Sequence, residues 1–261
     1  VENYPGYPEG IGGPEMMIQL REQAERFGLT VEDKNVERVD FSERPFKIYV
    51  EGEEFLAKSV IISTGAEAIW LGAEGEEAQK GRGISVCATC DGAFFRDEEV
   101  MVIGGGDSAM EEATFLTRFA NKVTIINRRD VFRASKVMYD RAVANPKIEI
   151  IPHRQLKSWL SDENGLTGAI LEDPRDGSET EITVTGAFIA IGHKPITAFL
   201  DGQIDTDEEG YILHSKHTMT NVPGVFAAGD VVDTRYRQAV TAAGMGCQAA
   251  MDAEKWLEEQ N

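Results

Sequence analysis

The sequence predicts an α/β protein, and three observations carry that prediction. Glycine is frequent, at 26 of 261 residues, and it recurs where apolar segments end. Because glycine has no Cβ atom, it fits the tight turns between strands and helices. Strand-like apolar runs alternate with segments of helical apolar spacing, and 42% of the residues are hydrophobic. A chain of this length and composition can bury a core and form one or two domains.

The first predicted elements are a helix and a group of short strands. Apolar residues between positions 15 and 27 recur at helical spacing, and Gly28 is a suitable C-terminal stop. Short apolar runs between Val31 and Val50 then indicate strands separated by turn residues. The run from Ser59 to Ala66 predicts a buried strand that ends at a glycine turn.

A predicted βαβ unit contains the clearest binding motif of the chain. The strand 99–103 leads into Gly104-x-Gly106-x-x-Ala109, a helix continues to about Phe119, and the next strand covers 122–126. The first glycine allows the tight turn, the second lets backbone approach a pyrophosphate, and the small third residue lets helix pack on strand. The helix N-terminus faces the phosphates. This context favours a dinucleotide site over an ordinary glycine turn.

The end of the second strand of this unit indicates which nucleotide binds. A site for NAD would place Asp or Glu there to hold the ribose 2′-hydroxyl. The chain instead has Asn127-Arg128-Arg129, with Arg133 close behind. Guanidinium groups match the oxygens of a 2′-phosphate. In a chain with a net charge of −19, three arginines so close together favour NADPH over a solvated basic turn.

Cys87-Ala88-Thr89-Cys90 is the predicted redox centre. The spacing lets two thiols close a small disulfide ring, and such a motif often lowers the pKa of one thiol. Thiol–disulfide exchange would then pass two electrons onward. Asp91 follows directly, and it is either the acid that protonates a leaving thiolate or a turn residue.

A metal site at these cysteines is the alternative that we disfavour. Zinc would need two further soft ligands. The third cysteine, Cys247, is distant in sequence, and the four histidines show no ligand spacing. We therefore expect no metal. We also expect Cys247 to be a small buried residue of a last helix between about Ala239 and Glu259.

The predicted chemistry also requires a flavin. A pyridine nucleotide gives up a hydride, whereas a disulfide accepts two electrons and protons, and a flavin converts between the two. The strand from Val225 to Asp230 supports FAD, because an acid after Ala-Ala-Gly could hydrogen-bond the ribityl or phosphate region of a flavin.

The composition limits the partners and the compartment. A net charge of −19 disfavours nucleic acids and anionic membranes, because both require clustered Lys and Arg. No stretch of sequence is apolar enough to span a bilayer, and no signal peptide is visible. Three cysteines are not a disulfide framework, so we expect a cytoplasmic protein in which the CxxC pair is catalytic.

Taken together, the motifs resemble those of the low-molecular-weight thioredoxin reductases, the type of bacteria, archaea and plants. The resemblance covers essentially the whole chain, and order and spacing hold throughout. The matching segments are Glu2-Asn3-Tyr4-Pro5-Gly6, Cys87-Ala88-Thr89-Cys90-Asp91-Gly92, Gly104 to Ala113, Arg128-Arg129-x-x-Phe132-Arg133-Ala134, Ala190-Ile191-Gly192-His193-x-Pro195, Phe226 to Val231, Tyr236-Arg237-Gln238-Ala239 and Gly246-Cys247.

The resemblance implies two doubly wound, Rossmann-like nucleotide-binding domains of the pyridine nucleotide-disulfide oxidoreductase type, one inserted into the other. The FAD domain would comprise residues 1–68 and 198–261. The NADPH-binding domain, with the redox CxxC motif, would comprise residues 69–197. The resemblance also implies a homodimer in which one domain rotates against the other during turnover.

The resemblance further implies a thioredoxin-disulfide reductase. NADPH would reduce FAD, FAD would reduce the Cys87–Cys90 disulfide, and the dithiol would reduce thioredoxin. Cys90 would face the flavin, Cys87 would attack thioredoxin, and Asp91 would supply the proton. The residues that would hold NADPH are Gly104, Gly106, Ser108, Ala109, Arg128, Arg129 and Arg133. The residues that would contact FAD are Asn3, Asp230, Arg237, Gln238 and Ala239.

The chain departs from the family pattern at two places. Asn127 stands where the family usually has His before the two arginines, and we expect NADPH preference to survive because Asn can still hydrogen-bond. The family's first strand-GxGxxA/G-helix unit, which binds the ADP half of FAD, has no counterpart before Asn3. We therefore expect the 261-residue chain to hold FAD poorly.

Two other functions are compatible with the sequence. One is the flavoprotein reductase of a peroxide-reducing (alkyl hydroperoxide reductase) system, although the Ala88-Thr89 dipeptide is more like that of thioredoxin reductase. The other is a non-catalytic NADPH-binding module that has lost its flavin. The intact cysteine pair and Asp91 argue against that second alternative.

Overall fold

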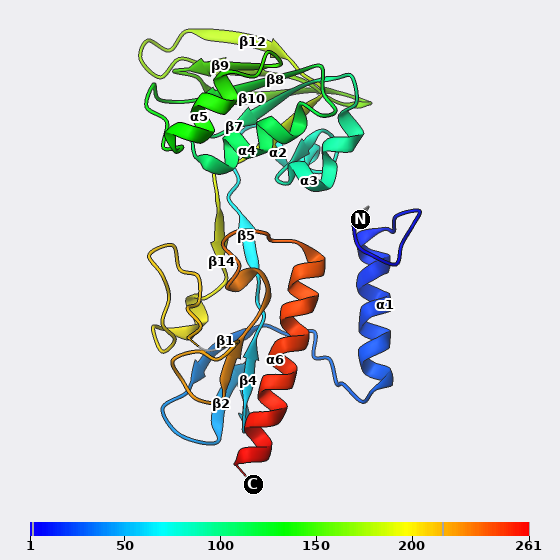
Figure 1. Ribbon diagram of the computed structural model, residues 1–261, viewed down its shortest axis with the longest axis vertical. Coiled ribbons are helices and arrows are strands. Elements are labelled where there is room, and N and C mark those ends of the chain that lie inside the picture. The colour runs from blue at the N-terminus through cyan, green and yellow to red at the C-terminus, as the bar shows by residue number, and fades with distance from the viewer. Residues whose placement is uncertain (2, 216, 261) are drawn as a thin grey trace. The chain divides into compact units, whose positions relative to one another are not determined.

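The computed structural model describes residues 1, 3–215 and 217–260, so Glu2 of the family-like opening lies outside the described residues. The chain divides into two compact units, Val1–Glu67 with His193–Asn261, and Ala68–Gly192. The strands β5 (Ala66–Ala68) and β14 (His193–Pro195) pair with each other where the chain passes between the units (Figure 1).

The unit Ala68–Gly192 is built on a five-stranded sheet with the order β6-β13-β7-β8-β9. All four strand pairs of this sheet are parallel. The strands are β6 (Ile84–Ser85), β7 (Glu99–Ile103), β8 (Lys122–Asn127), β9 (Ile148–Pro152) and β13 (Gly186–Ile189), and the helices α4 (Asp107–Leu116) and α5 (Lys136–Val143) connect β7 to β8 and β8 to β9. The predicted βαβ unit is therefore confirmed. The order in which the chain adds strands to the sheet reverses between β7 and β13. Parallel sheets of this type bind ligands at such a topological switch point.

Different layers cover the two faces of this sheet. Side chains alternate along a strand, so Val100 and Val102 of β7 face a helical layer that includes α4 and α5. Met101 and Ile103 face the other way, toward an antiparallel sheet. That second sheet consists of β10 (Gln155–Asp162), β11 (Gly165–Glu172) and β12 (Glu179–Thr183). Coverage on both faces explains why residues 100–103 of β7 are all apolar and buried.

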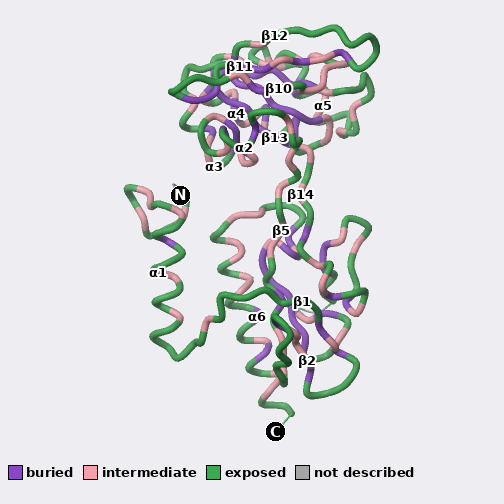
Figure 2. Tube along the Cα trace, turned by 180° about the vertical axis from the view of Figure 1, so that it is seen from behind, coloured by how far each residue is buried: buried purple, intermediate pink, exposed green. Residues whose placement is uncertain are grey.

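The other unit combines a small antiparallel sheet with a parallel pair of strands. Its antiparallel sheet is β1 (Val36–Asp40), β2 (Phe46–Val50) and β3 (Glu53–Ala57), and β4 (Val60–Ile62) pairs in parallel with β15 (Val225–Ala227). The long helix α6 (Ala239–Glu259) packs Ala249 and Ala253 against Phe226. Helix α1 (Gly13–Arg26) buries only Met16 among its residues and is otherwise largely exposed in Figure 2.

The elements agree with the predicted α/β class, but two sequence-based expectations are wrong. The run 59–66 is not a buried strand, because its strand β4 covers only Val60–Ile62 and buries only Ile62. Cys247 is a free cysteine and is exposed, not buried. Helix α6 buries only Ala249 and Ala253, and Cys247 lies two residues before Ala249, about 200° around the helix. Within residues 1, 3–215 and 217–260, no helix is both long enough and apolar enough to cross a membrane.

Candidate active site and cofactor sites

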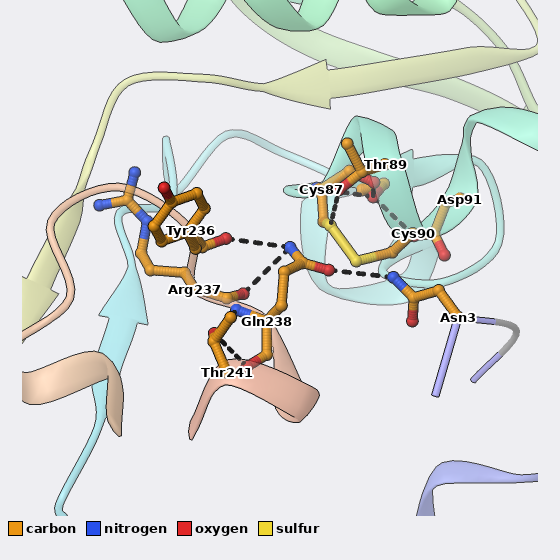
Figure 3. Close-up of a disulfide and its surroundings, with 10 residues drawn as sticks. Asn3, Cys87, Thr89, Cys90, Asp91, Tyr236, Arg237, Gln238 and Thr241 are labelled. Carbon is orange, nitrogen blue, oxygen red and sulfur yellow. Dashed lines mark hydrogen bonds between the residues drawn. A yellow bond between two sulfur atoms is a disulfide. The ribbon is translucent and has the colours of Figure 1, made fainter. Parts of the chain in front are cut away.

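The redox pair lies at the start of the short helix α3 (Ala88–Asp91), directly after β6. Cys87 precedes the helix in an extended conformation, and Cys90 lies within its single turn. Their Cα atoms are 5.3 Å apart and their sulfur atoms form a disulfide (Figure 3). The backbone N–H groups of Cys90 and Asp91 both donate to the carbonyl oxygen of Cys87. One helical turn therefore brings the two sulfurs together, as the CxxC spacing predicts.

Ser85 connects the two ends of this redox turn. Its hydroxyl donates to Oδ2 of Asp91 at 2.6 Å, and it accepts the backbone N–H of Cys87 at 3.1 Å. The Ser85 residue is only 7% exposed, so its position is fixed by packing as well as by these bonds. A single hydroxyl thus holds the Asp91 carboxylate and the backbone of Cys87 in one arrangement.

The glycine turn after β7 has the geometry of a dinucleotide site. Gly104 has a positive φ of 156°, and an added Cβ would lie 2.4 Å from the carbonyl oxygen of Ala190. That same Cβ would lie 3.0 Å from the Cβ of Ala109, which shows how closely α4 packs on the turn. A Cβ on Gly106 would meet nothing within 4 Å, so the turn is open at the N-terminus of α4. Ser108, in the first turn of α4, is exposed. The sites of steric crowding and of open space match the roles of the motif's glycines.

The arginine loop, residues 128–135, follows β8 and lies against the glycine turn. The backbone N–H groups of Arg133 and Ala134 donate to the carbonyl oxygen of Gly105 at 2.7 and 3.0 Å. The side chains at Arg128, Arg129 and Arg133 belong to exposed residues. The backbone of the loop is therefore anchored beside the turn at Arg133 and Ala134, and the three exposed arginines are accessible to an anion.

Asp230, in the unit Val1–Glu67 with His193–Asn261, has a buried carboxylate oxygen without a protein partner. Its Oδ1 atom accepts no hydrogen bond from the residues that the structure describes. Burial raises the pKa of Asp230, the charge of Asp233 raises it further, and the guanidinium of Arg237 opposes both effects. A buried acceptor of this kind lacks only a donor, such as the hydroxyl of a bound molecule.

Asp233 organises the segment that leads into α6. Its carboxylate accepts the backbone N–H groups of Arg235, Tyr236 and Arg237 at 2.7–2.9 Å. Although burial opposes its ionisation, these three donors and the charge of Arg237 hold the pKa of Asp233 below its usual range. The carboxylate also stabilises Arg237 at a positive φ of 47°.

Gln238 ends this segment and caps α6. A capping box joins Gln238 and Thr241, and Oε1 of Gln238 accepts a hydrogen bond from Nδ2 of Asn3 at 2.9 Å (Figure 3). Nη1 of Arg237 donates to the hydroxyl of Tyr211, and Ala239 is exposed at the first position of α6. The structure thus brings Asn3 to the start of α6, although the two lie 235 residues apart in the chain.

Comparison with known proteins decides between the families that share these features. Residues 5–246 match the family described as "Pyridine nucleotide-disulphide oxidoreductase". The thioredoxin reductase of Mycolicibacterium smegmatis is 53% identical over 100% of this chain and 84% of its own length. Thioredoxin reductase 2 of Arabidopsis thaliana is 53% identical over 99% of this chain and 70% of its own.

The solved structures indicate the same family. The thioredoxin reductase of Giardia duodenalis superposes with a TM-score of 0.94 at 44% identity, over 99% of this chain and 85% of that one. This chain belongs to the thioredoxin reductases. Members of this family are oxidoreductases that contain FAD and use NADPH.

The described residues fit both cofactors of a thioredoxin reductase. For NADPH, the turn is sterically closed at Gly104 and open at Gly106, with exposed arginines beside it. For FAD, the observation is the buried Oδ1 of Asp230, which lacks a donor in the described part of the chain. The segment ordered by Asp233 and capped by Gln238 lies in the same unit and presents the N-terminus of α6.

Several residues of these sites were not predicted from the sequence. Ser85 and Asp233 organise the redox turn and the α6 segment, but neither lies in a motif that signals a role. The only local signal was for Asp233, since an aspartate followed by turn residues often accepts their backbone N–H groups. Ser85 offered no such signal, because its partners depend on how β6 and α3 meet.

Proposed function

We propose that Cys87 and Cys90 carry electrons that originate in NADPH to a disulfide of thioredoxin. The observation that carries the proposal is the Cys87–Cys90 disulfide, held through Ser85 beside Asp91, in the same unit as an NADPH-type turn. Bound FAD supplies the conversion between the hydride chemistry of the nicotinamide and the two-electron chemistry of sulfur.

In the dithiol form, Cys87 is the attacking thiolate. It attacks one sulfur of the thioredoxin disulfide, the S–S bond breaks, and the other sulfur leaves as a thiolate that takes up a proton. Cys90 then attacks the Cys87 sulfur of the mixed disulfide, which releases the second thioredoxin thiol and restores the Cys87–Cys90 disulfide. Asp91, positioned by the Ser85 hydroxyl, supplies a proton to a leaving thiolate. Thioredoxin gains two electrons and two protons.

The cofactor sites are assigned as follows. Residues 69–197 bind NADPH, and residues 1–68 and 198–261 bind FAD. Gly104, Gly106, Ser108 and Ala109 accommodate the pyrophosphate of NADPH, while Arg128, Arg129 and Arg133 bind its 2′-phosphate. On the FAD side, Asp230 accepts a hydroxyl of FAD at its Oδ1 atom. Asn3, Arg237, Gln238 and Ala239 contact FAD at the N-terminus of α6.

The assembly and the compartment also belong to this proposal. We propose a homodimer, as the family resemblance implies. We propose the cytosol as the compartment, because a cysteine pair that cycles between dithiol and disulfide is suited to a reducing environment.

The test is an anaerobic assay of the 261-residue chain with added FAD and NADPH. Free thiols formed in thioredoxin are measured, and a disulfide-containing peroxide-reducing protein serves as the competing acceptor. We expect thioredoxin to be reduced faster than the competing acceptor. Cys87→Ser and Cys90→Ser should each lower the rate more than about 1000-fold, whereas Cys247→Ser should not. NADPH binding without thiol formation in thioredoxin would refute the proposal.

A further inference from the structure

Asn127, the last residue of β8, closes the arginine loop with its side chain. Its Nδ2 atom donates to the carbonyl oxygen of Arg129 at 2.9 Å and to that of Val131 at 3.3 Å. Both partners can only accept hydrogen bonds, so the amide nitrogen must face them. Because an amide NH₂ group has two hydrogens on one atom, it can serve both carbonyl groups at once.

The same side chain packs on the glycine turn. An ideal Cβ on Gly105 would lie 2.8 Å from Oδ1 of Asn127, and the other two atoms of the amide group are within 3.0 Å of it. Gly105 is not among the glycines with positive φ, so its backbone conformation is open to other residues. An added Cβ at Gly105 would therefore displace the Asn127 amide, which fills the space beside this glycine.

Two further contacts fix the far end of the arginine loop on the turn. The carbonyl oxygen of Gly105 accepts the N–H groups of Arg133 and Ala134. Oδ1 of Asp107 accepts the N–H of Ser135 at 2.6 Å. At the near end, the side chain of Asn127 joins the backbone of the exposed Arg128 and Arg129 to the glycine turn. A long, exposed guanidinium binds selectively only if its backbone is held in place.

We propose that Asn127, seated on Gly105, is a positioning residue that sets the preference for NADPH over NADH. It holds the arginine loop in the conformation that receives a 2′-phosphate. This inference rests on the proposed function, because it assigns the 2′-phosphate to Arg128, Arg129 and Arg133. NADH has no 2′-phosphate and makes no use of the arginine loop, so its binding does not depend on Asn127.

The first test is Asn127→Leu, which keeps the size of the side chain and removes its donors. The ligands are 2′,5′-ADP and 5′-AMP, which differ only in the 2′-phosphate, and binding is measured by calorimetry on the 261-residue chain. We expect the Kd of 2′,5′-ADP to rise about tenfold and that of 5′-AMP to stay within about twofold. The ratio of the Kd values for NADPH and NADH should change in the same direction.

The matched control is Asn121→Leu. Asn121 precedes the other end of β8, and its Nδ2 atom also donates to a backbone carbonyl oxygen, that of Asp97. This control removes an amide–carbonyl bond from the same strand without touching the arginine loop. It should leave both Kd values within about twofold of the unmodified chain. The thermal unfolding midpoint is recorded for both variants.

A second variant keeps the test decisive if Asn127→Leu does not fold. Gly105→Ala places a Cβ against the Asn127 amide and removes no donor. It should weaken 2′,5′-ADP binding about tenfold in the unmodified chain, but have little effect once Asn127→Ala has made room. Non-additivity of this kind is expected only if Gly105 acts through Asn127.

The outcomes separate the inference from the proposed function. Unchanged 2′,5′-ADP binding in Asn127→Leu, or equal weakening of 2′,5′-ADP and 5′-AMP, overturns the inference alone. Additive effects of Gly105→Ala and Asn127→Ala also overturn it. Failure of the unmodified chain to prefer 2′,5′-ADP over 5′-AMP overturns the assignment of the arginine loop, and the inference with it.

Discussion

The NADPH-type turn and the segment before α6 both fit nucleotide cofactors, but different forces hold them. The turn and its arginine loop come from one continuous stretch, residues 104–135. Steric fit sets the shape of the glycine turn itself, and local hydrogen bonds hold the loop on it. Gly104 has no room for a Cβ beside Ala190, and Gly105 has none beside Asn127. The segment before α6 is instead shaped by polar side chains. Asp233 accepts hydrogen bonds from three backbone N–H groups, and Gln238 accepts one from Asn3, which lies 235 residues away in the sequence.

This difference predicts that the two sites fail in different ways. A site held by steric fit should fail when volume is added and should be insensitive to pH. A site held by carboxylates should fail when an acceptor is lost, and its stability should depend on pH. The following substitutions test each half of the comparison.

The largest effect is expected for Gly104→Ala, compared with Gly106→Ala. In Gly104→Ala the new Cβ would lie 2.4 Å from a backbone oxygen, so the turn must move. We expect a loss of about 1–3 kcal/mol in the free energy of unfolding and about 100-fold weaker NADPH binding. The turn is open at Gly106, so Gly106→Ala should weaken NADPH binding about tenfold and leave unfolding unchanged. Chemical denaturation and calorimetry measure the two quantities. Equal stability losses in both variants would mean that steric fit does not hold the turn.

The second effect compares two aspartates of the polar site, Asp233 and Asp230. Asp233→Asn replaces one of the two acceptor oxygens by an NH₂ group, which would face a backbone N–H. We expect the free energy of unfolding to fall by about 1–3 kcal/mol. Asp230→Asn should instead raise it at neutral pH, because Asp230 has a buried oxygen without a partner in the described residues and burial disfavours its charge. Denaturant unfolding without added FAD measures both changes.

The pH dependence of these two variants should have opposite signs. The pKa of Asp233 is lowered on folding, so its stabilisation is present above the ordinary carboxyl pKa and is lost as pH falls through the lowered value. The pKa of Asp230 is raised on folding, so the folded state gains stability below the ordinary carboxyl pKa and loses it as pH rises through the raised value. The advantage of Asp230→Asn should therefore vanish in acid. An advantage that persists in acid would contradict the assignment of charge burial to Asp230.

The difference between a local site and one assembled from distant segments also explains which features could be predicted from the sequence. The NADPH-type turn lies within one βαβ unit, so strand, glycine spacing and arginines could be interpreted together. Asn3 and Gln238 meet only in the folded chain, and they were assigned through family resemblance alone. The exposure of Cys247 was predicted wrongly, because a helix with Ala and Gly on several faces does not reveal which face packs. The contacts of Ser85 depend on how β6 and α3 meet, and those of Asn127 depend on the arginine loop and the glycine turn.

The smallest effect is expected at the redox turn. This turn is one continuous segment, like the glycine turn, but the polar side chain of Ser85 holds it. Ser85→Ala removes the hydroxyl that donates to Asp91 and accepts the N–H of Cys87. We expect about tenfold slower thioredoxin reduction, the cost of about 1–2 kcal/mol in positioning. The pH profile of the rate should also change, because the proton donor is displaced. In an Asp91→Asn background, the same substitution should cost little, since Ser85 acts mainly through Asp91. Equal losses in both backgrounds would instead show that Ser85 acts through the Cys87 backbone, and that the redox turn, like the glycine turn, depends on local backbone shape.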